Sequence, residues 1–150
     1  MTADAVVAAL VAWARATLPA LAGGYSYTPA GKTQALPDVV ADHATIEYVL
    51  EDPQRFPMLG FQQRLLAVHS VGLSFMVDNT DEAAAAAALR GYADALAASL
   101  LRDGTLGGRV PLCSPIMTFD FTRPFVEYQD GTRGREMTLE MFVADPVEAP

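Results

Sequence analysis

The sequence predicts an α+β fold in a single domain, residues 1–150, with a mainly antiparallel sheet flanked by two main helices and a projecting C-terminal hairpin. Two segments carry apolar residues at spacings of three and four, as helices do, and several others alternate apolar and polar residues, as strands do. The strands come in neighbouring runs joined by short connections, which favours antiparallel pairing. With 150 residues, 51% of them hydrophobic, the chain can bury one substantial core.

The first helix is predicted over residues 4–18, where apolar side chains form one stripe and Pro19 ends it. Residues 23–38 are rich in glycine, proline and small polar residues and include Tyr25 and Tyr27. Such a composition indicates a loop or extended arm, and loops of this length in a compact domain usually have a function.

Two alternating strands follow, over residues 39–51 and 64–78. One face of the first strand is expected to carry Ala44, Ile46, Tyr48 and Leu50, and the other face His43, Thr45, Glu47 and Glu51. In the second strand His69 falls on the apolar face, which indicates a buried core or interface histidine.

The second helix is predicted with Asn79 as its N-cap and Glu82 as the reciprocal acidic partner. Its body runs through an alanine-rich stretch to Leu100, and Asp103-Gly104 ends it.

The last third of the chain is again predicted as strands. Residues 117–122 alternate, and residues 125–129 and 135–143 flank a turn at Asp130-Gly131. The resulting hairpin, residues 125–137, has a polar tip with Arg133 and Arg135, bordered by Phe125 and Tyr128.

Composition and charge exclude several functions. The formal net charge is −8, with one lysine and nine arginines spread along the chain, which disfavours gripping the DNA backbone. A single cysteine, Cys113, excludes an internal disulfide or a multi-cysteine zinc site and favours a reducing compartment. Asp4 and Arg15 argue against a secretory signal, and no apolar run reaches the ~18 residues of a membrane span.

No motif indicates catalysis. Gly31-Lys32-Thr33 resembles part of a phosphate loop, but Ser26 stands where the first glycine belongs and Pro37 precludes the helix that should follow. His43 and His69 have neither the surroundings of a hydrolase nor metal-ligand spacing. The sequence therefore predicts a protein that is not an enzyme and has no metal or cofactor.

Several segments together resemble the tail terminator, or tail completion, proteins of long-tailed bacteriophages. They are the N-terminal helix, AGKTQALPDVV before the first strand, LLRDGTLGGRVP at the end of the second helix, and FVEYQDGTRGREMTLEMFVAD near the C-terminus. These segments cover most of the chain in the right order.

The resemblance implies a structural virion protein at the tail–neck junction, assembled in the host cytoplasm. Such a protein forms a homo-oligomeric ring, a hexamer, that caps the tail tube, stops polymerisation of the major tail tube protein and offers a surface for a neck or head-closure protein. DNA passes through the ring without sequence-specific binding, and no membrane, cofactor or catalytic residue is involved.

On this hypothesis the arm and the hairpin contact other subunits or neck and tail proteins. The expected interface residues are Tyr25, Tyr27, Phe125, Tyr128, Arg133 and Arg135, and the expected channel-facing acids are Glu47, Glu51 and Asp52. Two alternatives stay open: a head-closure or head–tail joining neck protein, and a small cytoplasmic enzyme or ligand-binding domain.

Overall fold

The computed structural model describes residues 1–19, 21, 38–50, 65–122, 126–127 and 133–147. The elements in chain order are α1 (Ala3–Thr17), β1 (Asp38–Leu50), β2 (Leu65–Asp78), α2 (Glu82–Arg102), β3 (Leu112–Asp120), β4 (Val126–Glu127) and β5 (Arg133–Pro146). The strands form one antiparallel sheet in the order β1-β2-β5-β3, and β4 pairs with the start of β5. The predicted α+β fold is confirmed.

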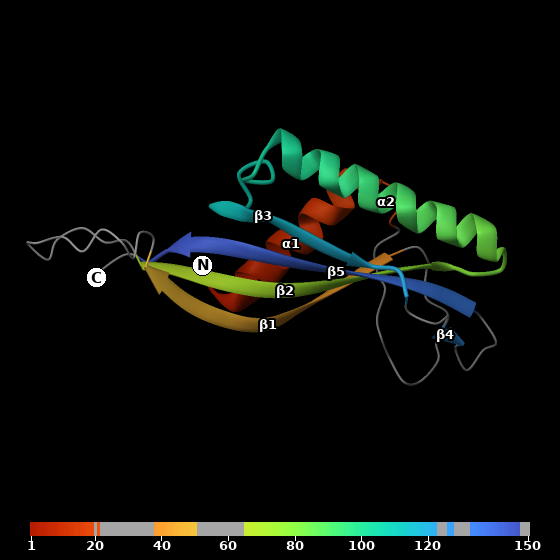
Figure 1. The fold of residues 1–150 in the computed structure, drawn as a ribbon, viewed down its shortest axis with the longest axis horizontal. Helices are drawn as coiled ribbons and strands as arrows, with labels where there is room; N and C mark the ends of the chain where they lie inside the picture. Colours follow the sequence, from red (N-terminus) through yellow and green to blue (C-terminus); the bar gives the residue numbers. More distant parts are fainter. Residues whose placement is uncertain (20, 22–37, 51–64, 123–125, 128–132, 148–150) are drawn as a thin grey trace, which may run out of the picture.

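Both helices lie on the same face of the sheet (Figure 1). The core fills the space between this face and the helices, because each long strand turns its apolar side chains toward them. Its largest fully buried side chains include Trp13, Phe75, Leu73, Leu89, Leu96, Met137 and Leu139. The opposite face, called the open face below, is covered by neither helix.

Helix α1 begins at an N-cap, Thr2, whose hydroxyl oxygen accepts a hydrogen bond from the Ala5 N–H at 3.1 Å. The predicted stripe is present, but the helix also buries Val6 and Trp13, which the stripe did not include. The indole Nε1–H of Trp13 donates to the Ser99 hydroxyl at 2.9 Å and so ties α1 to α2.

The predicted N-cap of α2 is wrong. Asp81 caps the helix, accepting from the Ala84 N–H at 3.1 Å, and Glu82 is the first helical residue. Asn79 is instead buried beside β5, where its backbone N–H donates to the Arg133 carbonyl oxygen at 2.9 Å. A turn immediately after β2 delays the start of the helix.

In the described part of the chain, that turn is one of three with the same construction. In each, an aspartate Oδ1 accepts both the backbone N–H and the hydroxyl of a threonine two residues later, at 2.6–2.8 Å. The pairs are Asp78 with Thr80, Asp103 with Thr105, and Asp120 with Thr122. They end β2, α2 and β3 respectively, so a local side-chain bond terminates each element.

The predicted faces of β1 are partly wrong. The register of β1 against β2 shifts between His43 and Thr45, so Ala44 is an extra residue in a bulge. The bulge moves His43 to the helix-facing side, together with Ile46 and Tyr48. Strict alternation across Ala44 had placed His43 on the opposite face.

The connection from α2 to β3 turns through three left-handed residues, Leu106, Gly107 and Gly108. Leu106 is buried despite its φ of 54°, and a Cβ added at Gly107 would approach Arg109 Nη1 to 2.8 Å. The loop brings Gly104 beside β3, because the Cys113 N–H donates to the Gly104 carbonyl oxygen at 2.8 Å.

Strand β3 begins at Leu112, before the predicted residue 117, and ends at Asp120. Near the C-terminus, Val126 and Glu127 pair with Gly134 and Arg133. Residues 128–132 lie outside the described residues, so the projecting hairpin stays a prediction.

Candidate functional site: an open sheet face between two exposed edges

The open face of the sheet carries acidic side chains from all four long strands. The register places on this face Asp42 and Glu47 of β1, Asp78 of β2, Asp120 of β3, and Glu136 and Glu140 of β5. Within the described strands, no lysine or arginine shares this face, because Arg133 and Arg135 occupy helix-facing positions of β5. The open face is therefore a source of negative potential.

The centre of the open face is smooth. Asp42, Gly72, Glu140 and Thr118 form one row across the four strands, and a Cβ added at Gly72 would meet no heavy atom within 4 Å. Hydroxyl residues fill much of the neighbouring rows. Such a surface can bear charge but forms no concave site for a small substrate.

Strand β1 forms one edge of the sheet and exposes large apolar side chains. Tyr48 is 63% exposed, and Ile46 and Val49 are also exposed. In the described part of the chain, β1 pairs only with β2, so the backbone groups on its outer side have no strand partner. Exposed apolar residues on an unpaired edge mark a surface that another chain can cover.

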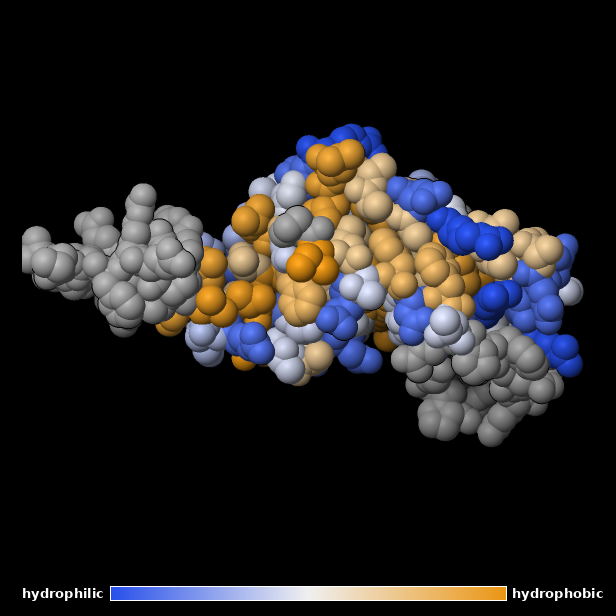
Figure 2. Space-filling model, viewed as in Figure 1, coloured by the Kyte–Doolittle hydropathy of each residue, from blue (hydrophilic) through white to orange (hydrophobic). Residues whose placement is uncertain are grey.

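Strand β3 forms the opposite edge, below the C-terminal end of α2. It includes Pro115, a residue that sheets accept mainly on their edges. Leu101 on α2 is 89% exposed, and on β3 Ile116 is 61% exposed and Leu112 is also exposed. Figure 2 shows apolar side chains gathered over β3 and alongside α2.

A groove of about 500 Å³ opens between α2 and β3. Its lining is largely apolar: Ala97, Leu100, Leu101, Gly104, Cys113, Met117 and Phe119. Burial raises the pKa of the Cys113 thiol to about 11, so the sulfur stays protonated and unreactive near neutral pH.

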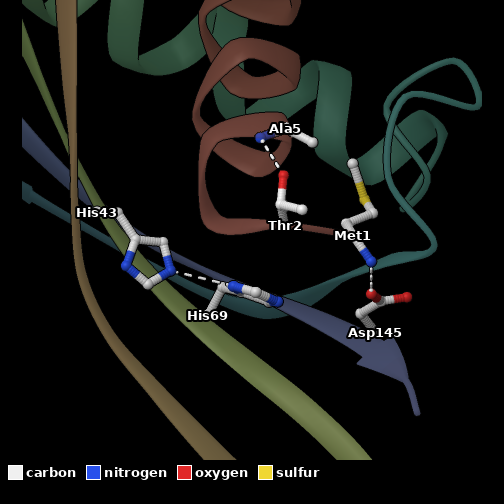
Figure 3. Close-up of polar contacts among 6 residues, drawn as sticks. All are labelled: Met1, Thr2, Ala5, His43, His69 and Asp145. Atoms are coloured by element: carbon white, nitrogen blue, oxygen red, sulfur yellow. Dashed lines mark hydrogen bonds and ion pairs between the residues drawn. The ribbon is translucent and has the colours of Figure 1, made fainter.

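A second cleft, of about 540 Å³, lies at the end of the sheet beside the N-terminus of α1. Ile46, Tyr48, Ala67, His69 and Asp145 are among its lining residues. The His43 and His69 rings share a hydrogen bond, with His43 Nε2 3.0 Å from His69 Nδ1 (Figure 3). On the far side of His69, the Met1 ammonium pairs with the Asp145 carboxylate.

His69 is a buried histidine, as predicted, with only 2% of its surface exposed. Its Nε2 has no hydrogen-bond partner among the residues that the structure describes. Burial and the neighbouring His43 lower the pKa of His69, and the Asp145 carboxylate raises it by a smaller amount. The ring is therefore neutral at neutral pH, and no nucleophile shares its hydrogen bond with His43.

The stability of the fold should depend on this histidine. Because the pKa of His69 lies below its ordinary value of 6.5 in the folded chain, the unfolded chain binds the proton first as the pH falls. We expect the free energy of unfolding to stay constant above pH 6.5. As the pH drops below 6.5, the free energy of unfolding should decrease, by at most ~1.4 kcal/mol per pH unit. Urea unfolding followed by circular dichroism, between about pH 8 and pH 5, measures the slope.

Two variants are the controls for this pH dependence. His69→Gln should remove most of the slope, and His43→Gln, which keeps a neutral hydrogen-bonding group beside His69, should reduce it. An unchanged slope in a folded His69→Gln protein would assign the pH dependence to other groups.

The structure describes only part of the predicted site. Glu47 is exposed on the open face as a channel-facing residue must be, whereas Glu51 and Asp52 lie outside the described residues. Of the predicted interface residues, Arg133 and Arg135 lie at the start of β5, away from Glu47 at the far end of β1. Tyr25, Tyr27, Phe125 and Tyr128 lie outside the described residues.

Sequence reasoning did not select Asp42, Glu140, Tyr48 or Leu101 as site residues. The pairing of β5 with β2 is what aligns Glu140 with Asp42 across Gly72. Leu101 could have been found from the Leu100-Leu101 pair, since adjacent residues of a helix cannot both point to one core.

Among the described residues, no three His, Cys, Asp or Glu side chains are placed to hold a metal ion. No helix in the described part of the chain is long and apolar enough to cross a membrane. No protein-family model matches the chain, and no curated protein matches it.

Proposed function

We propose that the chain is a structural subunit of a phage tail terminator ring, which caps the tail tube, ends its polymerisation and provides the surface for head attachment. The observation that carries the proposal is the one-sided sheet. Both helices cover one face, and the other carries acids from all four long strands with Gly72 at its centre. A sheet of this kind suits the inner wall of a channel, with the helices on the outside.

The charge of the open face supports a role in DNA passage. Carboxylates on a channel wall repel the phosphate backbone, so DNA meets no surface to which it can adhere. Glu47 and the acids aligned with Gly72 would line the channel, and the small residues between them would leave its wall smooth.

The sheet topology supports head-to-tail closure. The ordered path β1-β2-β5-β3 contains an even number of antiparallel strands, so β1 and β3 run in opposite directions. Rotation about a ring axis preserves strand direction, and β1 of one copy would therefore lie antiparallel to β3 of the next. Each boundary repeats the antiparallel pattern found inside the subunit, and such heterologous contacts close into rings.

The test is tube capping. A major tail tube protein would be polymerised with and without the purified chain, and the tubes imaged by electron microscopy. The proposal predicts shorter tubes that carry extra ring density at one end. Tubes of unchanged length without end density would contradict it, and binding only to isolated neck or head proteins would favour the head-closure alternative.

A further inference from the structure

We propose that the groove between α2 and β3 receives the exposed β1 edge of a second copy of this chain, with Ile46 and Tyr48 of one copy against Leu101 and Met117 of the next. The inference rests on the proposed ring, because it assigns the two surfaces that meet at each boundary.

The two surfaces match in character. The groove has a largely apolar lining, which includes Leu101, 89% exposed. The β1 edge presents the complementary projection, with Tyr48 63% exposed and Ile46 beside it. Burying both would remove the largest exposed apolar side chains of the two edges from water.

The two edges differ in charge. Arg102 and Arg109 are exposed near the groove and donate to the backbone carbonyl oxygens of Ala98 and Leu106. The β1 edge exposes Asp42 and Glu47 on its open-face side. Contact between two β1 edges would bring these carboxylates together, so the difference favours contact between unlike edges.

The two surfaces also lie at the same level along the strands. Cys113 of β3 pairs with Val143 of β5, Val143 with His69 of β2, and His69 with Ile46 of β1. The groove and the exposed β1 residues are thus opposite ends of one row across the sheet. Rotation about an axis along the strands brings them together.

They lie on the same side of the sheet as well. The β1 register puts Ile46 and Tyr48 on the helix-facing side, where α2 also lies. When β1 pairs with β3 of the next copy and extends its sheet, these two side chains enter the space between that copy's β3 and α2. The open acidic face is left free by this contact.

Disulfide cross-linking tests the contact. Tyr48→Cys and Leu101→Cys are made as separate variants and as a double variant, and each is oxidised in dilute solution. All variants also carry Cys113→Ala, because Cys113 lines the groove that Tyr48 is proposed to enter. The proposal predicts covalent dimers when the two single variants are mixed, none in either variant alone, and a ladder of larger species in the double variant.

A matched pair of charge variants adds a second readout. Arg102→Glu, near the groove, should slow cross-linking by about tenfold, as loss of electrostatic steering does. Arg90→Glu makes the same charge change elsewhere on α2 and should leave the rate unchanged. Equal rates in the two variants would overturn the charge argument.

The outcomes separate the contact from the ring. Dimers of Tyr48→Cys alone would show a contact between two β1 edges and overturn the proposal. Rings seen by native mass spectrometry without mixed cross-links would overturn the contact and leave the proposed function intact. Monomers without cross-links at high concentration and on tail tubes would overturn both.

Discussion

Replacing Trp13 by alanine is expected to lower the free energy of unfolding by about 3–5 kcal/mol, because it empties the largest side-chain site of the core. Trp13 is 2% exposed, and its indole N–H bonds to Ser99 on α2. Domains of this size have a total stability of about 5–15 kcal/mol, so the variant should be partly unfolded at 37 °C. Urea unfolding followed by circular dichroism gives the value.

Two variants separate packing from hydrogen bonding at this site. Ser99→Ala leaves the indole N–H without its partner and should cost about 1–3 kcal/mol. Trp13→Phe retains most of the buried ring and should cost less than Trp13→Ala. A loss of about 1 kcal/mol for Trp13→Ala, typical of an average substitution, would show that α1 does not close the core.

The double variant Asp42→Lys with Glu140→Lys is expected to make a ring that retains DNA. These two residues flank Gly72 in one row of the open face. Each substitution replaces a carboxylate, which repels the DNA phosphates, by an ammonium group, which can bind them. Each phosphate contact that forms should steepen the dependence of log K on log salt by about 0.9. We expect no binding by the natural sequence and a Kd of about 10⁻⁴–10⁻⁶ M for the variant, measured by fluorescence anisotropy on duplex DNA.

The control for net charge is Glu82→Lys with Asp94→Lys. Both residues are exposed on α2, so this variant has the same change of net charge on the helical side of the molecule. It should bind DNA more weakly than the open-face variant. Equal binding by the two would mean that total charge, and not its placement on the open face, governs the interaction.

The element order and most of the strand faces could be predicted from the sequence, because local periodicity determines both. His69 lies on the apolar face of β2 as expected, since no bulge interrupts the pairing of β2 with β5. The face of His43 could not be predicted, because the extra residue at Ala44 is defined only by pairing with β2. The start of α2 was missed for a related reason: the Asp78–Thr80 turn competes with the helix for the same residues.

The candidate site was harder to predict than the fold. Its acids come from four strands, and only the sheet order β1-β2-β5-β3 brings Asp42 and Glu140 into one row. The exposed edges likewise depend on which strands end the sheet, which periodicity does not reveal. Glu47 could be predicted because it alternates with apolar neighbours, and the structure places it on the face opposite those neighbours.

The most direct test of the account is an electron cryomicroscopy map of the chain bound at the end of a tail tube. The account predicts a closed ring of six copies in which the open acidic face of every sheet lines the channel and α1 and α2 lie outside. A map with the helices lining the channel, or with no closed ring at the tube end, would contradict it.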